Sequence, residues 1–391
     1  MLDLTKLANS MQGISQHLTL EAAAGIQRRK LAQQLLTAAY AQQAALVEKQ
    51  KQWRDRILFN AATPVEPLNT CIDLPIPPKV HTVIATDGSQ IAPNHHEIAY
   101  CYLLNIGRVM LHYGQNRQPL LDSLPEVFYR PEDLYVSRQW GIRTEEWMGY
   151  KRTASETVVL AELAGNAPMS VPTLAMVDGS LIYWFLEQLP HEARDRILPP
   201  IIDAWDRMQE FGIPIMGYLS ASRSGESLNF LRLQACIHEN PDCTTYCPNQ
   251  LEKLPCQVLE PLKDAALWTI ELKPGQRSAF WRSSARITES YNTHSIYFCY
   301  VHVGTEIARI ELPAWVAEDS VLLEQSLGLM LAQVQKGYGY PVALAEAHNQ
   351  AVVRGGDRAS FFALLEQQMI KAGLQNVAIS YKEARKRGSI A

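Results

Sequence analysis

The chain has 391 residues and carries 36 Lys and Arg against 40 Asp and Glu, which gives a formal net charge of −4. This balance predicts no overall field toward nucleic acid or membranes, although a local basic path would still suit DNA. The composition, 47% hydrophobic and 19% charged, is typical of a globular protein with a buried core, and the length suits two or three domains. No secretory signal pattern or bilayer-length apolar run is evident, and seven cysteines without regular spacing do not suit a secreted disulfide scaffold. We therefore expect a cytoplasmic protein without a membrane partner.

The first 79 residues divide into two parts by composition. Residues 20–58 are rich in Ala, Gln, Leu, Lys and Arg and contain no proline, so we expect an N-terminal helical region over residues 1–60. This region is either a helical hairpin packed on its own domain or an arm for a partner or a second copy. Residues 61–79 contain five prolines and are predicted to be an extended linker.

From residue 80 to residue 391, strand-like and helix-like segments alternate. Apolar runs predict strands at residues 80–86, 98–106, 109–113, 173–177, 213–219, 296–303 and 306–311. Helical patterns occur at residues 144–163, 186–210, 317–335 and 341–353. Gly107 is expected to form a turn between the second and third strands, and Gly304 to join the last two strands in a hairpin. This alternation predicts an α/β fold with helices on the faces of a mixed sheet.

Two Asp-Gly-Ser sequences, at residues 87–89 and 178–180, are the most informative feature. Each aspartate is expected where an apolar strand stops, before a glycine that lets the chain turn away. Because a sheet brings strand ends together, Asp87 and Asp178 could converge, and their like charges would then require a cation. Oxygen ligands favour Mg²⁺ or Mn²⁺. The alternative is that each Asp-Gly pair is an ordinary turn.

The helix predicted between the two aspartates offers a third carboxylate. Glu156 precedes an apolar run, and Glu162 follows six residues later. Six helical residues turn the chain through about 600°, so the two side chains point to different faces and cannot both line one site. Either glutamate could instead be a solvated helix residue.

A C-terminal histidine is a further candidate. Pro341, Leu344 and His348 fall on one face of a predicted helix, so His348 is expected to point inward. It would be a metal ligand, an acid or a hydrogen-bonded core residue.

Basic residues gather locally. Residues 276–286 contain Arg277, Arg282 and Arg286 with two aromatic side chains and no acid, a combination that suits a phosphate backbone beside a stacking surface. Arg223 lies in a separate Ser-rich stretch. Each arginine alone could belong to an ordinary solvated surface; together they could form a path for DNA.

Four of the seven cysteines lie in an insert at residues 236–256. A structural Zn²⁺ ion or an iron–sulfur cluster could be bound there, with His238 as a substitute ligand. The four thiols are those of Cys236, Cys243, Cys247 and Cys256. Their spacing lacks the CxxC pair of most structural zinc sites, so reduced cysteines or a single disulfide are the alternative.

No Walker A loop, GxSxG elbow or HExxH sequence is present, and no GxGxxG follows a strand, so we expect no ATP hydrolysis by this chain. The sequence instead resembles the NurA nucleases from about residue 80 to residue 365. The resemblance rests on the glutamate-bearing helix and on five strings in order. These are IATDGSQ (84–90), MVDGSL (176–181), GQRS (275–278), ARIELPAW (308–315) and GYPVALAEAH (339–348).

The resemblance implies a ribonuclease-H-like core, a homodimer and an Mn²⁺-dependent nuclease. Such enzymes degrade DNA from the 5′ end and cut single strands, and they work at DNA ends with the hexameric ATPase HerA in end resection and double-strand-break repair. It also implies that Asp87, Glu156 and Asp178 are catalytic metal ligands, and that Tyr340 and His348 complete the site, His348 as a ligand or an acid.

Two departures from the family pattern stand out. Where the family often has a lysine, this chain has Ser220, Ala221 and Ser222 before Arg223, and the cysteine-rich insert is not expected in the family. Two other functions stay open, since one fold hosts several chemistries: a catalytically inactive module that binds DNA ends or an ATPase, and an unrelated phosphohydrolase.

Overall fold

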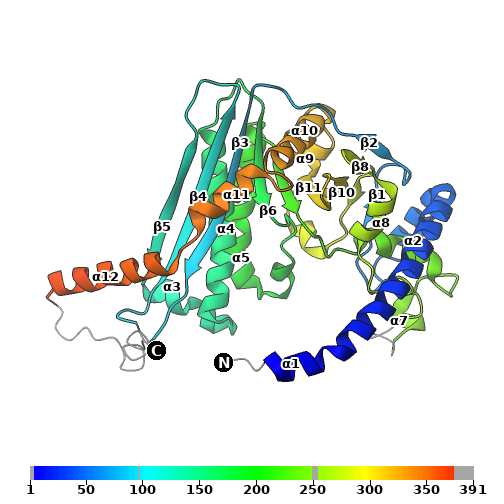
Figure 1. Ribbon diagram of the computed structural model, residues 1–391, viewed down its shortest axis with the longest axis horizontal. Coiled ribbons are helices and arrows are strands. Elements are labelled where there is room, and N and C mark those ends of the chain that lie inside the picture. The colour runs from blue at the N-terminus through cyan, green and yellow to red at the C-terminus, as the bar shows by residue number, and fades with distance from the viewer. Residues whose placement is uncertain (1–3, 96, 249–253, 374–391) are drawn as a thin grey trace. The chain divides into compact units, whose positions relative to one another are not determined.

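The computed structural model describes residues 4–95, 97–248 and 254–373. The chain forms two compact units, each built from two separate stretches (Figure 1). The first unit contains residues 1–74 and 218–314, and the second contains residues 75–217 and 315–391. The expected division at residues 60 and 79 therefore does not coincide with the units, because residues 218–314 join the N-terminal part.

The second unit contains a mixed sheet. Its strands are β3 (His81–Ile91), β4 (Tyr102–Tyr113), β5 (Leu120–Phe128), β6 (Thr173–Asp178) and the first three residues of β7 (Ile215–Leu219). Their spatial order is β7-β6-β3-β4-β5. Strand β3 pairs in parallel with β6 and antiparallel with β4, which in turn pairs antiparallel with β5. The predicted α/β class with a mixed sheet is confirmed.

Helices cover both faces of this sheet. They are α3 (Pro131–Tyr135), α4 (Thr144–Gly165), α5 (His191–Glu210), α10 (Ser320–Lys336), α11 (Val342–Ala351) and α12 (Gly355–Lys371), with the short α9 (Ala314–Ala317) where the chain enters from the first unit. Helices α4 and α5 lie on one face, and α11 crosses the other (Figure 1). Leu174, Ala175 and Met176 of β6 are fully buried, as expected for a parallel strand with helices on both sides.

Two expectations about the first strands are wrong. Strand β3 does not stop at Asp87 but continues to Ile91, and residues 102–113 form one strand through Gly107 rather than two strands with a turn. Glycine can adopt the extended backbone of a strand as well as that of a turn. The pairing of β3 with β4 continues without a break through Gly107. Strand β5 and helix α12 were not predicted.

The first unit contains a second group of strands, all antiparallel. They are β1 (Thr63–Pro64), β2 (Cys71–Asp73), β8 (Gln276–Ser278), β9 (Trp281–Arg282), β10 (Ile296–His302) and β11 (Ile307–Pro313). Strands β10 and β11 form the hairpin expected across Gly304. Strand β1 pairs with β9, and β2 pairs with β8, so part of the predicted linker at residues 61–79 is strand.

The helices of the first unit are α1 (Leu4–Ser10), α2 (Gln12–Gln52), α6 (Glu226–Arg232), α7 (Cys243–Tyr246) and α8 (Asp264–Glu271). The N-terminal region is therefore not a hairpin, because α2 is a single helix of 41 residues. Ala32, Leu36 and Ala39 of α2 are buried in the core of this unit with Trp268 and Trp281. None of the described helices has the length and apolar character needed to cross a membrane.

Candidate active site

Asp87 lies where strands β3 and β6 diverge. Their parallel pairing ends at Thr86 and Val177, whereas the pairing of β3 with β4 continues to Ile91. Asp178 is the last residue of β6 and follows Val177 directly. The two aspartates thus occupy the next positions of two adjacent strands. Asp87 and Asp178 therefore lie side by side, as predicted. The reason differs from the expected one: only β6 ends at its aspartate, whereas β3 separates from β6 at Asp87 and continues to Ile91.

Helix α4 brings Glu156 to the same place. A Cβ on Gly88 would lie 2.3 Å from Glu156 Oε1 and 2.7 Å from Arg152 Cγ, so the missing side chain leaves the space that the carboxylate occupies. The Thr86 hydroxyl donates a 2.9 Å hydrogen bond to the Glu156 carbonyl oxygen, which ties α4 to β3. Glu162, six residues along α4, is exposed. Of the two glutamates, only Glu156 lies beside the aspartates.

His348 contacts Asp87 from the opposite face of the sheet. Its Nδ1 lies 2.8 Å from Asp87 Oδ2. The His348 side chain is 63% exposed, so the expectation that it points inward is wrong. The buried face of α11 is formed by Ala343, Leu344 and Ala347 instead. His348 is therefore accessible from solvent while it touches the aspartate.

Tyr340 completes the group. Its hydroxyl donates a hydrogen bond to the Asp178 carboxylate. Tyr340 immediately precedes Pro341, the N-cap residue of α11, so this one helix and its approach supply both Tyr340 and His348. The five residues expected at the site, Asp87, Glu156, Asp178, Tyr340 and His348, thus lie together in the second unit.

The crowded carboxylates influence one another. Burial raises the pKa of Glu156 to about 7, and the charges of Asp87 and Asp178 raise it as well, whereas Arg152 lowers it. Burial also raises the pKa of Asp178, against the Tyr340 hydroxyl and His348, which lower it. In such a cluster, burial and neighbouring negative charges make the ionised carboxylates less stable. A cation bound among the carboxylates stabilises their ionised forms.

The donor set fits a hard divalent cation, since it consists of three carboxylates and one imidazole. Across the described ranges, however, no three such side chains are placed so that they could already hold one ion. Arg152 Nε lies 3.2 Å from Glu156 Oε1, although this buried nitrogen makes no hydrogen bond. The guanidinium and a metal ion would therefore compete for the Glu156 carboxylate. Arg152 was not predicted to be part of the site, although its i, i+4 spacing to Glu156 is typical of an ion pair on a helix.

The four arginines predicted to contact DNA, all in the first unit, differ in their surroundings. Arg223, Arg282 and Arg286 are exposed. Arg277 is only 7% exposed, and its two terminal nitrogens lie 2.6 and 2.9 Å from the carboxylate of Glu66. Arg277 is therefore a correction to the predicted set, because its guanidinium is already used inside the unit.

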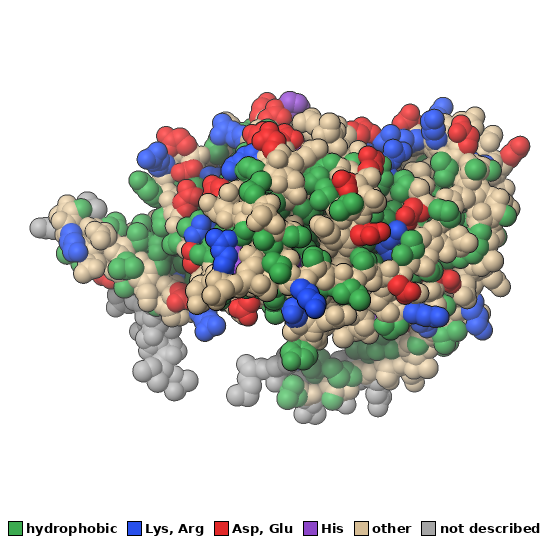
Figure 2. Space-filling view, turned by 90° about the horizontal axis from the view of Figure 1, so that it is seen from above, with side chains coloured by type: hydrophobic (Ala, Val, Ile, Leu, Met, Phe, Trp, Pro, Cys, Tyr) green, Lys and Arg blue, Asp and Glu red, His purple; other side chains and the backbone are tan. Residues whose placement is uncertain are grey.

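Basic and acidic side chains are interspersed on the molecular face drawn in Figure 2. This agrees with the net charge of −4. Any DNA path on this face is therefore local rather than a broad basic field.

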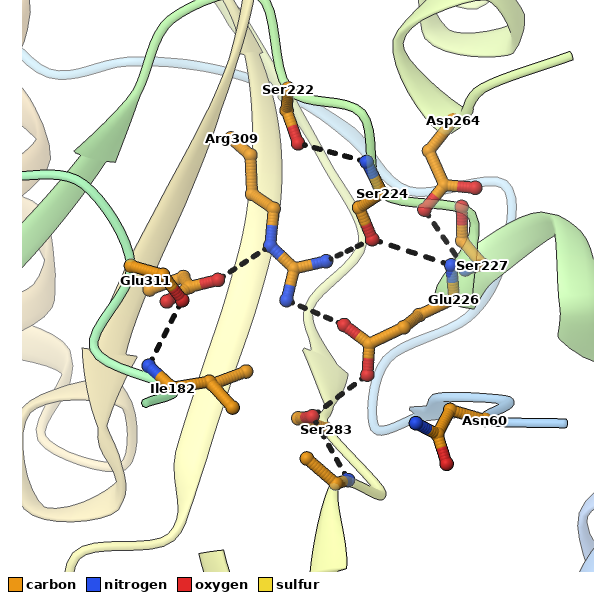
Figure 3. Close-up of polar contacts among 12 residues, drawn as sticks. Asn60, Ile182, Ser222, Ser224, Glu226, Ser227, Asp264, Ser283, Arg309 and Glu311 are labelled. Atoms are coloured by element: carbon orange, nitrogen blue, oxygen red, sulfur yellow. Dashed lines mark hydrogen bonds and ion pairs between the residues drawn. The ribbon is translucent and has the colours of Figure 1, made fainter. Parts of the chain in front are cut away.

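The ARIELPAW string contributes a second group of charges, which has a different character (Figure 3). The Arg309 guanidinium lies 2.7 Å from Glu311 and 2.7 Å from Glu226, and all three side chains are buried. It also donates a 2.7 Å hydrogen bond to Ser224. Asp264 nearby accepts the backbone N–H groups of residues 227 and 228. These acids are satisfied by fixed partners, so we assign the group to the structure of the first unit.

Comparison with known proteins places the chain in a family. A model of the NurA domain matches residues 81–353, which reach from the start of β3 to just beyond α11. The crystal structure of the NurA nuclease from Sulfolobus solfataricus shares the fold, with a TM-score of 0.56 at 13% identity over 95% of this chain and 98% of that chain. A crystal structure of NurA with manganese matches with a TM-score of 0.36 at 11% identity, over 78% of this chain and 91% of that one. No curated protein matches the chain. Because the domain match spans well over half of its length, the chain belongs to the NurA family.

Proposed function

We propose that this protein is a metal-dependent deoxyribonuclease that hydrolyses phosphodiester bonds at DNA ends. The observation that carries the proposal is the convergence of Asp87, Glu156 and Asp178 from β3, α4 and β6 in a chain of the NurA family. From the family resemblance we further propose 5′-to-3′ exonuclease and single-strand endonuclease activity, in end resection and double-strand-break repair in the cytoplasm.

Asp87, Glu156 and Asp178, with His348, would hold Mn²⁺ or Mg²⁺. A divalent cation supplies a more acidic bound water and positive charge beside the phosphate. The protein's own part begins with Arg152, which keeps the Glu156 carboxylate oriented beside Gly88 until the glutamate is needed as a ligand.

His348 is suited to move a proton. Its contact with Asp87 through Nδ1 favours the tautomer with hydrogen on Nδ1, so Nε2 is the basic nitrogen. Because the side chain is 63% exposed, a substrate can reach that nitrogen. His348 would therefore bind the metal through Nε2 or, once Nε2 has taken up a proton, donate that proton to the leaving oxygen, while the hydroxyl of Tyr340 orients Asp178.

One observation favours a second candidate, a module that binds DNA ends or an ATPase without catalysis. The ion pair of Arg152 with Glu156 already neutralises one carboxylate of the site. If this ion pair persists in the presence of metal, Arg152 takes the place of the cation and Glu156 does not act as a metal ligand. Substitution of Arg152 distinguishes the two: Arg152→Gln should tighten Mn²⁺ binding in an enzyme and leave it undetectable in an inactive module.

For partners, we propose DNA, single-stranded and at duplex ends, together with a HerA-like hexameric ATPase and a second copy of this chain. The N-terminal helices support self-association. Leu4, Leu7, Met11, Ile14 and Leu18 are all exposed, between 37% and 68%, at alternating spacings of three and four residues. This is the spacing of a two-stranded coiled coil, in which like helices pair through such a stripe.

The proposed activity is tested with the purified full chain and DNA labelled at either the 5′ or the 3′ end. With Mn²⁺ present, 5′-labelled duplex should release short labelled products first, whereas 3′-labelled duplex should shorten progressively. Addition of EDTA should stop both reactions. If, with every metal tested, the products match those of a reaction without protein, nuclease activity is rejected and the binding module is favoured.

A further inference from the structure

The four cysteines of the insert line one small cavity in the first unit. Cys243, Cys247 and Cys256 are only 6–7% exposed, Cys236 is half-buried, and all four are free thiols. The thiols of Cys236, Cys247 and Cys256 all lie within electrostatic range of Cys243. Four thiols from along the insert thus border the same cavity without a disulfide.

The local structure orients two of the thiols. The Asp242 side chain caps helix α7 by accepting the Thr245 N–H at 3.0 Å, and it also accepts both neighbouring threonine hydroxyls. Cys243 is the first residue of α7 and Cys247 is its C-cap residue, whose N–H donates a 3.0 Å hydrogen bond to the Cys243 carbonyl oxygen. The apolar cluster around them is small: its buried members are Cys247, Leu254 and Cys256, with Phe59 and Ala235 packed against it.

Arg232 supplies the independent observation. It is 5% exposed, its Nε donates a 3.0 Å hydrogen bond to Cys256 Sγ, and its guanidinium lies 4.0 Å from the ring centre of Phe59. One terminal nitrogen is buried without a hydrogen-bond partner. Arg232 also borders a second cavity together with Glu260, but its hydrogen bond among the described residues goes to the Cys256 sulfur. A buried guanidinium at this distance favours the anionic, thiolate form of that sulfur.

We propose that Cys236, Cys243, Cys247 and Cys256 bind a structural metal centre as thiolates, and that Arg232 is its buried charge partner. Four thiolates around Zn²⁺, or around a four-iron cluster, carry net negative charge, which satisfies the guanidinium. The His238 ring lines the same cavity and is stacked on Tyr246 with centroids 4.4 Å apart, so it remains the substitute ligand beside the four thiols.

The geometry also says how the centre forms. No three ligand side chains of the described residues could already hold a single ion. A zinc ion must therefore draw the sulfurs toward one point, whereas an iron–sulfur cluster binds each cysteine at a different iron. Both are thiolate-bound metals, and both stabilise a segment that has little core of its own.

The test measures zinc, iron and acid-labile sulfide in the full chain, purified without oxygen and without chelator. The proposal expects about one zinc per chain, or about four iron and four sulfide with a broad visible absorbance band. The two results identify which metal is native. Less than about a tenth of an equivalent of either metal, in the purified protein and after reconstitution with Zn²⁺ or with iron and sulfide, overturns the proposal.

Variants assign the ligands and the partner. Cys247→Ser should lose most of the metal, whereas Cys71→Ser, an exposed cysteine outside the insert, should keep it. Asp87→Asn should also keep it, which separates this centre from the proposed catalytic metal. If Cys247→Ser fails to fold, Arg232→Gln replaces it: faster release of metal to a chelator than from wild type and from Arg232→Lys is expected. Equal release from all three proteins, or equal loss in Cys71→Ser, contradicts the proposal.

Discussion

Gly107 lies directly opposite Asp87 in the antiparallel ladder of β3 and β4. A Cβ on Gly107 would lie 2.4 Å from the Ala347 carbonyl oxygen and 2.5 Å from the Ala351 nitrogen, so the backbone of α11 rests on the strand at this point. His348 follows Ala347 in the same helix. The glycine therefore sets the distance at which α11 presents His348 to Asp87.

Gly107→Ala should lift α11 from the sheet, because a rigid backbone rather than a flexible side chain meets the new methyl group. We expect a loss of about 1–3 kcal/mol in the free energy of unfolding and a weaker contact between His348 and Asp87. Chemical denaturation measures the first effect, and the NMR chemical shifts of the His348 ring nitrogens report the second. Gly149→Ala, at a helical glycine with open space around it, is the control and should be neutral or slightly stabilising. Equal destabilisation by both substitutions would contradict the role given to Gly107.

The sequence predicted this site only in part, and the reasons are physical. Helical periodicity shows that Glu156 and Glu162 cannot share a site, but only the tertiary contact with Gly88 selects Glu156. Gly107 suggested a turn because glycine permits turns; its actual role is to admit another backbone, which no local pattern reveals.

The same limit explains the two side chains whose exposure was not foreseen. His348 was expected inside because it shares a helix face with Leu344, whereas alanines allow α11 to pack so closely that His348 lies at the rim. Arg277 lies in a basic stretch, and its partner Glu66 is 211 residues away in the chain. Long-range pairing of this kind cannot be inferred from local composition.

The pH dependence of stability should identify Glu156. Its pKa is about 7 in the fold against an ordinary 4.5, so the native state binds more protons than the unfolded state between those values. The free energy of unfolding should therefore fall as pH rises from about 4.5 to 7. Glu156→Gln removes this loss, so in metal-free buffer it should match wild type near pH 4 and exceed it by about 1–3 kcal/mol at pH 8. Glu162→Gln should follow the wild-type curve; parallel curves for Glu156→Gln and wild type would be inconsistent with the assignment.

The exposed arginines and the buried one should behave oppositely. Arg282→Ala and Arg286→Ala should each weaken DNA binding, reduce its salt dependence by about one unit of slope, and leave the melting temperature nearly unchanged. Arg277→Ala should instead destabilise the fold by about 1–3 kcal/mol, because the half-buried Glu66 loses both guanidinium contacts and keeps only the Phe280 N–H. Fluorescence anisotropy against salt and thermal unfolding measure the two effects. A normal melting temperature for Arg277→Ala, with loss of DNA binding, would restore it to the DNA-contacting set.

The exposed stripe of α1 and α2 should control self-association without affecting the fold. Ile14→Lys and Leu18→Lys place charges in the stripe, and sedimentation should show a monomer for them, against the dimer expected of wild type. Gln16→Lys makes the same charge change outside the stripe and should remain dimeric. Removal of residues 1–60 is a poor test, because it would also remove Ala32, Leu36 and Ala39 from the core. Dimers that survive both stripe substitutions would show that another surface carries the association.

The most direct test of the account is cleavage of end-labelled DNA by Asp87→Asn and Asp178→Asn in the presence of Mn²⁺. An amide keeps the shape of the carboxylate and loses the charge that holds a cation, so each variant should cut at least about a hundredfold more slowly than wild type. Circular dichroism should show that both aspartate variants keep the wild-type fold. Glu156→Gln should lose cleavage to a similar extent, whereas Glu162→Gln should cut DNA at the wild-type rate. Cleavage by both aspartate variants at the wild-type rate would contradict the assignment of the active site.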